Sequence, residues 1–336
     1  MLDSATQRRL ADQRILVIGD LILDRFVWGG VSRISPEAPV PVVEVQRETV
    51  YPGGAANVAR NLVPFTRHVS IIGRIGSDLA GGLLRDTLDR DGIGITDLIV
   101  SPTLPTTAKE RIFARNQQVV RVDREVVRGL EPSEKAEILS VLDGRLGDFD
   151  AIILQDYGKG FLDQELVDAI ASRARRASVL TIADPKPSNP LAWGGINVVK
   201  PNRAELLELA GVPRSAPSPD PLEDRAVLTA CEILRERWQN DHLLVTLSEQ
   251  GMLLVPRHGE IVHVPAEARE VFDVSGAGDT ALALFALALA AGASPADAAA
   301  LANRASSIVV GKLGTATVEP SEVFAATASP EPVLRQ

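Results

Sequence analysis

Short apolar runs alternate with longer segments of helical period along most of this 336-residue chain. The apolar runs, which we interpret as buried strands, lie at residues 14–20, 69–73, 151–155, 179–183, 196–200 and 242–247. The helical segments lie at residues 78–91, 131–146, 163–177, 203–210, 222–238, 281–291 and 295–310. This alternation predicts an α/β fold with a mostly parallel central sheet that helices cover on both faces. Because the sequence shows no repeat and no long linker, we expect a single domain over residues 1–330.

Two stretches interrupt the alternation. Residues 25–51 lack a helical period, carry several prolines and include a run of alternating apolar and polar residues at 43–46. Residues 105–126 contain two further runs of β-like composition. A small exposed sheet needs a partner or a cover for its apolar face. We therefore expect the two stretches to form a small β lid that covers the cleft and provides the interface of a homodimer.

The apolar helix at 281–291 follows a glycine-containing loop, residues 273–280, which read DVSGAGDT. Gly276 and Gly278 place no Cβ in the way of a ligand, and the free N–H groups and dipole of a helix N-terminus attract anions. Asp279 lies at the mouth of this site, where it suits a base that deprotonates a hydroxyl attacking a phosphoryl group. The alternative is that Asp279 only caps the helix after a tight glycine turn.

Two more polar sites lie in the first 60 residues. Asp20 and Asp24 follow the first predicted strand, and ligands of open α/β sheets bind at the carboxyl ends of strands. Gly53, Gly54 and Asn57 belong to a second glycine loop that runs into a helix. Carboxylates accept hydrogen bonds from sugar hydroxyls, and an asparagine both donates and accepts them. A turn at Asp24 and an ordinary helix start after the glycines are the alternatives.

Polar groups also follow four of the predicted strands in the second half of the chain. They lie at residues 156–160, 184–186, 200–205 and 246–251. Any one of them is more simply a capped helix start or a turn. Four at one sheet edge, beside an anion loop, favour a nucleotide and phosphate site. Asn303 and residues 311–314 are candidates to flank the adenine.

The composition argues against several classes of partner and against secretion. The net charge of −9, without a basic tract, argues against nucleic acid and anionic membranes as partners. The single cysteine, Cys231, excludes a disulfide framework, and the polar N-terminal residues are not those of a signal peptide. We therefore expect a cytoplasmic protein. Only six of the 35 basic residues are lysines, and all except Lys135 fall in segments that we assign to the cleft or its lid.

The sequence resembles the ribokinase-like sugar kinases, also called the PfkB family. Two motifs carry the resemblance, PGGAAN at residues 52–57 and DVSGAGDT at residues 273–280. The resemblance extends over residues 14–323. It implies a ribokinase-like fold, ATP as the phosphate donor, Mg²⁺ as the metal ion, and a homodimer formed through the lid.

The resemblance also implies roles for individual residues. Asp279 would be the base that deprotonates the anomeric hydroxyl of the sugar, while backbone N–H groups of Gly276, Ala277 and Gly278 hold the transferring phosphate. The expected nucleotide-binding residues are Lys200, Asn202, Glu205, Thr246, Ser248, Gly251 and Asn303. Asn202 and Glu205 would also position Mg²⁺ through water. The expected sugar-binding residues are Asp20, Asp24, Gly53, Gly54 and Asn57.

Further segments resemble the branch of this family that converts D-glycero-β-D-manno-heptose 7-phosphate to the 1,7-bisphosphate, a precursor of ADP-heptose for lipopolysaccharide core. These segments are residues 19–25, 32–42, 115–118, 248–252 and 310–315. In many bacteria this kinase is fused to an adenylyltransferase, whose His-x-Gly-His motif is absent from this sequence. We therefore expect a stand-alone kinase. The alternatives are a kinase for another sugar or nucleoside, and a non-catalytic regulator that binds a nucleotide or a sugar.

The phosphate that such a substrate already carries needs cations, because charge-assisted hydrogen bonds to phosphate are strong. Arg33, Arg115, Lys159 and Lys186 are the candidates, from the lid and from the strand ends. Lys109, on the second β stretch, is a further candidate for substrate binding. For each of these residues, an ordinary exposed surface charge is the alternative.

Overall fold

A nine-stranded sheet forms the centre of the protein in the computed structural model, which describes residues 2–114, 117–267, 271–312, 314–325 and 333–334. The strand order is β15-β14-β13-β12-β11-β10-β9-β1-β4. The parallel strands are β1 (Arg14–Gly19), β4 (His68–Ile72), β9 (Ala151–Gln155), β10 (Leu180–Asp184), β11 (Val198–Val199) and β12 (His242–Thr246). Antiparallel strands β13 (Met252–Pro256), β14 (Val262–Val264) and β15 (Val333–Leu334) complete one edge.

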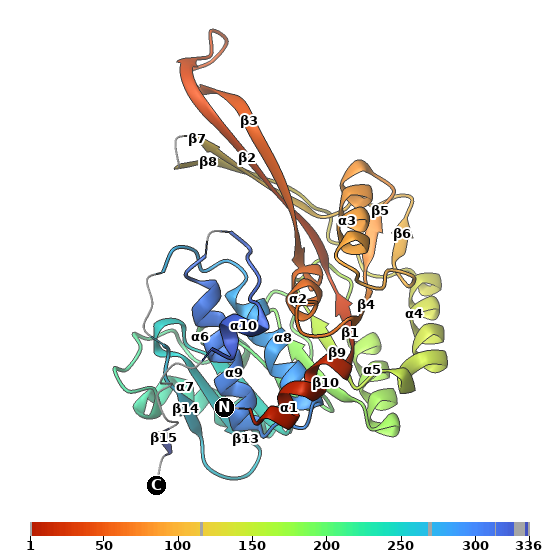
Figure 1. Ribbon diagram of the computed structural model, residues 1–336, viewed down its shortest axis with the longest axis vertical. Coiled ribbons are helices and arrows are strands. Elements are labelled where there is room, and N and C mark those ends of the chain that lie inside the picture. Colours follow the sequence, from red (N-terminus) through yellow and green to blue (C-terminus); the bar gives the residue numbers. More distant parts are fainter. Residues whose placement is uncertain (1, 115–116, 268–270, 313, 326–332, 335–336) are drawn as a thin grey trace.

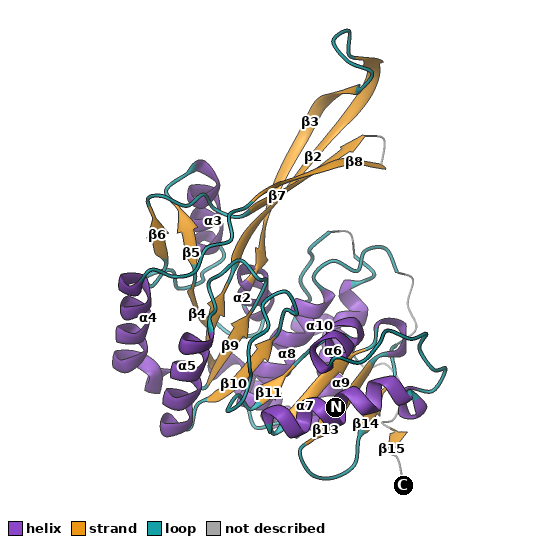
Figure 2. Cartoon of the chain, turned by 180° about the vertical axis from the view of Figure 1, so that it is seen from behind, coloured by secondary structure: helices purple, strands orange, loops and turns teal. Residues whose placement is uncertain are grey.

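Helices cover both faces of this sheet (Figures 1 and 2). On one face lie α1 (Ser4–Arg9), α2 (Ala55–Leu62), α8 (Ala277–Ala290), α9 (Pro295–Val309) and α10 (Pro320–Val323). On the other lie α4 (Pro132–Arg145), α5 (Gln164–Ala177), α6 (Arg203–Ala210) and α7 (Arg225–Trp238). Along β1, Ile15 and Val17 point into the first core and Leu16 and Ile18 into the second. Burial on both faces explains why the parallel strands are continuous apolar runs.

Short elements complete the core. The 3-10 helices are η1 (Leu10–Asp12), η2 (Leu146–Asp148), η3 (Pro221–Glu223) and η4 (Ser248–Gln250). A two-stranded sheet of β5 (Arg74–Gly76) and β6 (Ile99–Ser101) lies beside α3 (Leu79–Arg90) at the base of the lid (Figure 1). Within the described ranges, no helix combines the length and the apolar character needed to cross a membrane.

The two stretches that interrupt the alternation pair in one four-stranded sheet of order β3-β2-β7-β8, which projects from the core (Figure 1). The strands are β2 (Leu21–Ile34), β3 (Pro41–Gly54), β7 (Ala108–Ala114) and β8 (Gln117–Arg124). The first stretch was expected to be partly irregular, yet β2 and β3 form a hairpin of two 14-residue strands. The register shifts after Trp28 and after Val31 absorb the irregularity as bulges.

Candidate active site

A cavity of about 220 Å³ opens where the carboxyl ends of the parallel strands meet the N-terminus of α8. Its walls are formed by the ends of β9, β10 and β12, the first turn of α6 and the loop that opens α8. The lining residues are Gln155, Asp156, Tyr157, Asp184, Pro185, Lys186, Lys200, Asn202, Glu205, Thr246, Gly276, Gly278 and Asp279. The strand-end segments and the glycine loop that the sequence singled out therefore meet at one place.

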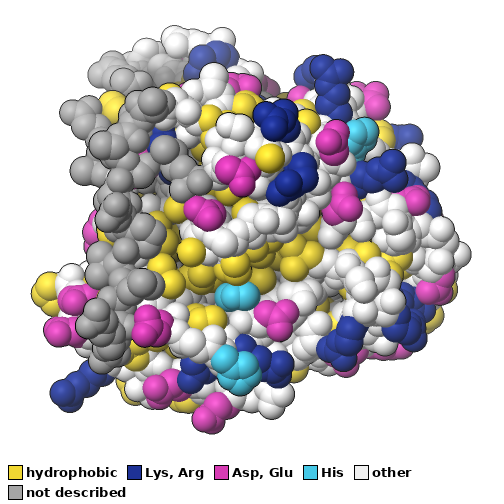
Figure 3. Space-filling view, turned by 60° about the horizontal axis from the view of Figure 1, so that its bottom comes forward, with side chains coloured by type: hydrophobic (Ala, Val, Ile, Leu, Met, Phe, Trp, Pro, Cys, Tyr) yellow, Lys and Arg dark blue, Asp and Glu magenta, His cyan; other side chains and the backbone are white. Residues whose placement is uncertain are grey.

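A larger hollow lies at the opposite edge of the sheet. It measures about 650 Å³ and is lined by strand starts and by the last turn of α8, among them Leu180, Val198 and Leu289. Figure 3 shows this end of the molecule, where apolar side chains are exposed between charged ones. None of the residues that we selected from the sequence lines this hollow.

The loop before α8 has the backbone conformation that an anion site requires. Gly276 is the N-cap of α8 and has φ 82°, a left-handed conformation that favours glycine. A Cβ on Gly276 would lie 2.9 Å from Nδ2 of Asn57. The free N–H groups of the first turn of α8 lie at the end of the helix that borders the cavity. The helix dipole adds partial positive charge there.

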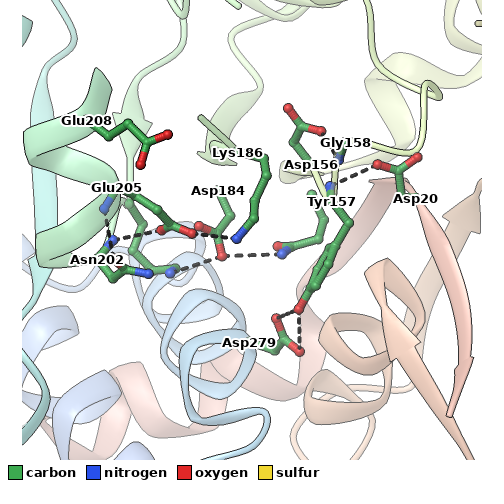
Figure 4. Close-up of polar contacts among 12 residues, drawn as sticks. Asp20, Asp156, Tyr157, Gly158, Asp184, Lys186, Asn202, Glu205, Glu208 and Asp279 are labelled. Carbon is green, nitrogen blue, oxygen red and sulfur yellow. Dashed lines mark hydrogen bonds and ion pairs between the residues drawn. The ribbon is translucent and has the colours of Figure 1, made fainter. Parts of the chain in front are cut away.

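Asp279 lies in the first turn of α8 and is 5% exposed. Asn57 Nδ2 donates to Asp279 Oδ2 at 2.6 Å. The Tyr157 hydroxyl donates to Asp279 Oδ1 at 3.2 Å (Figure 4). Both partners come from outside the helix, and the N-cap position belongs to Gly276. The alternative that Asp279 serves as the helix cap is therefore wrong.

Burial raises the pKa of Asp279 to about 7, although the hydrogen bond from Asn57 opposes the shift. Nearby Asp184 raises this pKa further, while Lys200 and Tyr157 lower it. A carboxylate with a pKa near neutrality is a far better proton acceptor than an ordinary aspartate. The environment of Asp279 therefore fits the role of base expected from the sequence.

Tyr157 is a residue of the site to which the sequence reasoning gave no role. It lies in the loop after β9, and burial raises the pKa of its hydroxyl well above the ordinary value, with the negative charge of Asp279 as the next cause. The hydroxyl therefore stays protonated at neutral pH and donates a hydrogen bond to Asp279. The sequence signal was its place in the polar segment at 156–160, where a buried tyrosine needs a hydrogen-bond partner.

Asp20 organises this loop rather than facing solvent. Its carboxylate accepts hydrogen bonds from the backbone N–H groups of Tyr157 at 2.8 Å, Lys159 at 3.1 Å and Phe161 at 3.2 Å. Burial raises the pKa of Asp20, and these hydrogen bonds oppose the shift. Three of the roughly four acceptor positions of a carboxylate are thus occupied. One acceptor position of the Asp20 carboxylate remains for a sugar hydroxyl, the role expected of this residue.

Asp24 has an ion-pair partner that the sequence did not suggest. Arg111 on β7 donates from one guanidinium nitrogen to Asp24 Oδ1 at 2.5 Å. A Cβ on Gly53 would collide with the other oxygen of Asp24. Gly54, at φ 61°, lies so close to the Asp20 carbonyl that a Cβ there would also collide. The glycine pair is therefore needed for close packing around the two aspartates.

The wall of the cavity at the start of α6 contains a second polar cluster (Figure 4). Asn202 and Glu205 form a reciprocal capping box at the start of α6. Glu205 Oε1 accepts a bond from Lys186 Nζ at 2.9 Å, and Lys200 Nζ lies 3.0 Å from Asp184 Oδ2. Lys186, which was expected at the sugar phosphate, lines the same cavity as Asp279 and forms its ion pair with Glu205 in this structure.

Other expected residues lie farther out. Thr246 lines the cavity, whereas Ser248 and Gly251 lie in the turn that follows β12, around η4. Asn303, on α9, donates from Nδ2 to the Pro265 carbonyl at 2.7 Å and does not line the cavity described above. Arg33 is exposed near the far end of the long β2–β3 hairpin, so it does not reach the cavity of its own chain. Arg115 lies outside the described residues.

The donor set suits a hard divalent cation. Gln155 Oε1 is buried without a hydrogen-bond partner among the described residues, and Gln155 lines the cavity together with Asp184 and Glu205. Carboxylate and amide oxygens are the ligands that Mg²⁺ prefers, and Mg²⁺ usually keeps several waters. The residues at this wall therefore fit a magnesium ion held largely through water.

The chain is similar to carbohydrate kinases over most of its length. Residues 12–322 match the profile described as pfkB family carbohydrate kinase. The bifunctional protein HldE of Citrifermentans bemidjiense is 42% identical over 317 residues, covering 94% of this chain and 64% of that protein. HldE of Geobacter sulfurreducens is 42% identical over 308 residues, covering 92% and 61%. The chain thus spans less than two thirds of the length of these relatives.

Solved structures share the fold at low sequence identity. Arabidopsis thaliana ribokinase complexed with ribose and ATP has a TM-score of 0.70 at 19% identity, with 93% of this chain and 97% of that chain covered. Escherichia coli phosphofructokinase-2 in complex with potassium has a TM-score of 0.73 at 18% identity, covering 93% and 96%. The expected ribokinase-like α/β fold is therefore confirmed.

Proposed function

Because the chain belongs to the pfkB family of carbohydrate kinases, we propose that it phosphorylates D-glycero-β-D-manno-heptose 7-phosphate at the anomeric hydroxyl with ATP. The observation that carries the proposal is a buried carboxylate, Asp279, with a pKa of about 7 in the first turn of a helix whose N-terminus forms an anion site. The choice of sugar rests on the sequence segments at 19–25, 32–42 and 310–315, which resemble the heptose-phosphate branch of the family.

The proposed reaction uses the two groups of α8 together. Asp279 accepts the proton of the sugar hydroxyl as that oxygen attacks the γ-phosphorus of ATP. Asn57 and Tyr157 hold the carboxylate in place through hydrogen bonds of 2.6 and 3.2 Å. The N–H groups at the start of α8 face the transferring phosphoryl group, where preorganised donors stabilise developing charge.

The opposite wall supplies positive charge and a place for a metal ion. Lys200 is 2% exposed, and its Nζ lies 3.7 Å from where a Cβ on Gly278 would be, so it lies beside the anion loop. Gln155, Asp184 and Glu205 would hold a magnesium ion through water. When bound, such an ion neutralises the charge on the phosphate oxygens during transfer.

Glu205→Gln tests the assignment of the metal. The substitution removes a charge but retains the size of the side chain, so we expect the Mg²⁺ concentration for half-maximal activity to rise about tenfold or more, as for other residues that orient metal ligands. A magnesium titration of the initial rate measures this. Glu208→Gln, one turn further along α6, is the matched control because Glu208 is paired with Arg214 on the surface. Equal curves for the wild type and Glu205→Gln would contradict the assignment.

The lid sheet is the proposed interface of a homodimer. It exposes several aliphatic side chains, among them Ile34 at 60%, Val45 at 55% and Val120 at 45%. We expect Val120→Asp to shift the mass found by light scattering toward that of one 35.9-kDa chain, because a charge there opposes burial. Val100→Asp is the control, since Val100 is 47% exposed on β6, outside the lid. A wild-type monomer, or a dimer that survives Val120→Asp, would argue against this interface.

A coupled ADP-release assay tests the function. The acceptors are D-glycero-β-D-manno-heptose 7-phosphate, ribose, fructose 6-phosphate and adenosine, each with Mg·ATP. Turnover with the heptose phosphate alone supports the proposal. Turnover with another acceptor retains the kinase and replaces the substrate. Binding of ATP without turnover on any acceptor would favour a regulator on the same fold.

A further inference from the structure

Two lysines from different parts of the chain converge on a single carboxylate oxygen at the base of the lid. Lys159 Nζ lies 2.8 Å from Glu125 Oε2, and Lys109 Nζ lies 3.5 Å from the same oxygen. The three side chains are 17%, 18% and 29% exposed, in the order Lys159, Lys109, Glu125. Lys109 belongs to β7 of the lid, whereas Lys159 follows β9 of the core. An oxygen held by two ammonium groups marks a preformed position for an anion.

The pair of lysines lies beside the region expected to bind the sugar. The backbone N–H of Lys159 donates to Asp20 at 3.1 Å, and Lys109 is the cross-strand partner of Asp24. Tyr157, two residues before Lys159, reaches Asp279 with its hydroxyl. One short loop therefore contacts both the proposed base and the lysine pair. A sugar with its reacting hydroxyl at one end and a phosphate at the other matches this arrangement.

Four basic side chains meet at the lid base. They are Lys109, Arg111, Arg121 and Lys159, and they pair with the acids Asp24, Asp123 and Glu125. Asp20, whose charge also acts on Lys159, balances the fourth basic group, so both lysines are held in place by acids among the described residues. The hydrogen bond from Lys159 lowers the pKa of Glu125, and burial opposes the shift without cancelling it. The carboxylate of Glu125 is therefore ionised at neutral pH.

We propose that Lys109 and Lys159 bind the phosphate that the acceptor sugar already carries, and that Glu125 occupies this position until the sugar phosphate displaces it. The inference rests on the proposed function and adds the subsite that selects a phosphorylated acceptor. A phosphate monoester carries nearly two charges and three strong acceptor oxygens, so it satisfies both ammonium groups better than one carboxylate. Glu125 is the most exposed of the three and can turn toward water. A sugar without the phosphate leaves Glu125 in place and gains nothing from either lysine.

Binding of heptose 7-phosphate and of the phosphate-free heptose, measured by calorimetry, tests the lysines. We expect Lys159→Met to weaken binding of the sugar phosphate about ten- to hundredfold, the value of a hydrogen bond to a charged group, and to leave the phosphate-free sugar unaffected. In kinetics the loss belongs in KM rather than kcat, because the distal phosphate does not react. Lys135→Met is the matched control, since Lys135 also pairs with two acids, Asp163 and Glu165, on the surface of the core.

Glu125→Gln should change KM for the sugar phosphate in the opposite direction to Lys159→Met. Removal of the competing charge should lower KM for the sugar phosphate about two- to fivefold, the range of a partly exposed ion pair. If Glu125 only held the lysines in place, KM would rise instead, and displacement would be refuted. If the wild type binds the sugar phosphate and Lys159→Met binds it equally well, the proposed subsite is refuted, whereas the proposed function is not. A wild type that neither binds nor phosphorylates any sugar phosphate would overturn the proposed function itself.

Discussion

Asp279→Asn is expected to lower kcat by about 10²–10⁴-fold, the usual contribution of a general base. The amide has nearly the shape of the carboxylate and can still meet Asn57 and Tyr157, but it cannot accept the proton of the sugar hydroxyl. The anion loop and Lys200 remain, so ATP binding should change little. Single-turnover measurements with Mg·ATP and the sugar phosphate give the rate, and calorimetry gives the affinity for the nucleotide.

The pH dependence follows from the same group. Because the base works only when it is ionised, kcat/KM should fall about tenfold per pH unit below a pKa near 7 and level off above it. Burial also raises the pKa of Asp156 to about 7, so Asp156→Asn is the control that separates the two carboxylates. That variant should retain the acidic limb of the profile, while Asp279→Asn loses it. Near-normal turnover in Asp279→Asn would remove Asp279 from the role of base.

Gly276→Ala is expected to lower kcat/KM by about 10²–10³-fold, the cost of losing one preorganised donor at a developing charge. Two effects act together. The φ of 82° is unfavourable for alanine, so the N–H groups at the start of α8 move. The new Cβ would lie 2.9 Å from Nδ2 of Asn57, the residue that holds Asp279. Steady-state kinetics with both substrates measures the loss.

Gly92→Ala is the matched control for backbone strain. Gly92 has φ 78°, and a Cβ there would have no neighbour within 4 Å in the described part of the chain. Gly92→Ala should lower the free energy of unfolding about as much as Gly276→Ala does, by roughly 1–2 kcal/mol. It should leave the rate of the kinase reaction unchanged. If both variants keep wild-type rates, or lose them equally, the loop before α8 is not the phosphate site.

The fold and the family could be predicted from the sequence. Buried parallel strands are continuous apolar runs, and the loop at 273–280 precedes a helix that is apolar on all sides, so both stand out without a structure. The ribokinase-like fold is confirmed, and so is membership of the pfkB family of carbohydrate kinases. Many of the residues that line the cavity were found in the same way, because strand ends of a parallel sheet meet at one edge; Gln155 and Tyr157 were not among them.

What the sequence could not reveal are contacts between distant segments. Asn57 was expected to meet the sugar, yet it donates to Asp279, 222 residues away. Lys186 forms an ion pair with Glu205. Arg33 lies near the tip of the β2–β3 hairpin, whose strand register no local pattern specifies. Arg111, on β7, and Glu125, just after β8, were not selected because a single charge there has no distinguishing neighbours in sequence. Their partners, Asp24 and Lys159, come from other elements.

The central claim is that the chain phosphorylates the anomeric hydroxyl of a sugar phosphate with Asp279 as base. The most direct measurement is the ³¹P NMR spectrum of D-glycero-β-D-manno-heptose 7-phosphate incubated with Mg·ATP and the wild-type protein. We expect a new phosphate signal coupled to the anomeric proton, beside the unchanged 7-phosphate signal, and its loss with Asp279→Asn. A new phosphate at another hydroxyl, or release of inorganic phosphate without a sugar product, would contradict the claim.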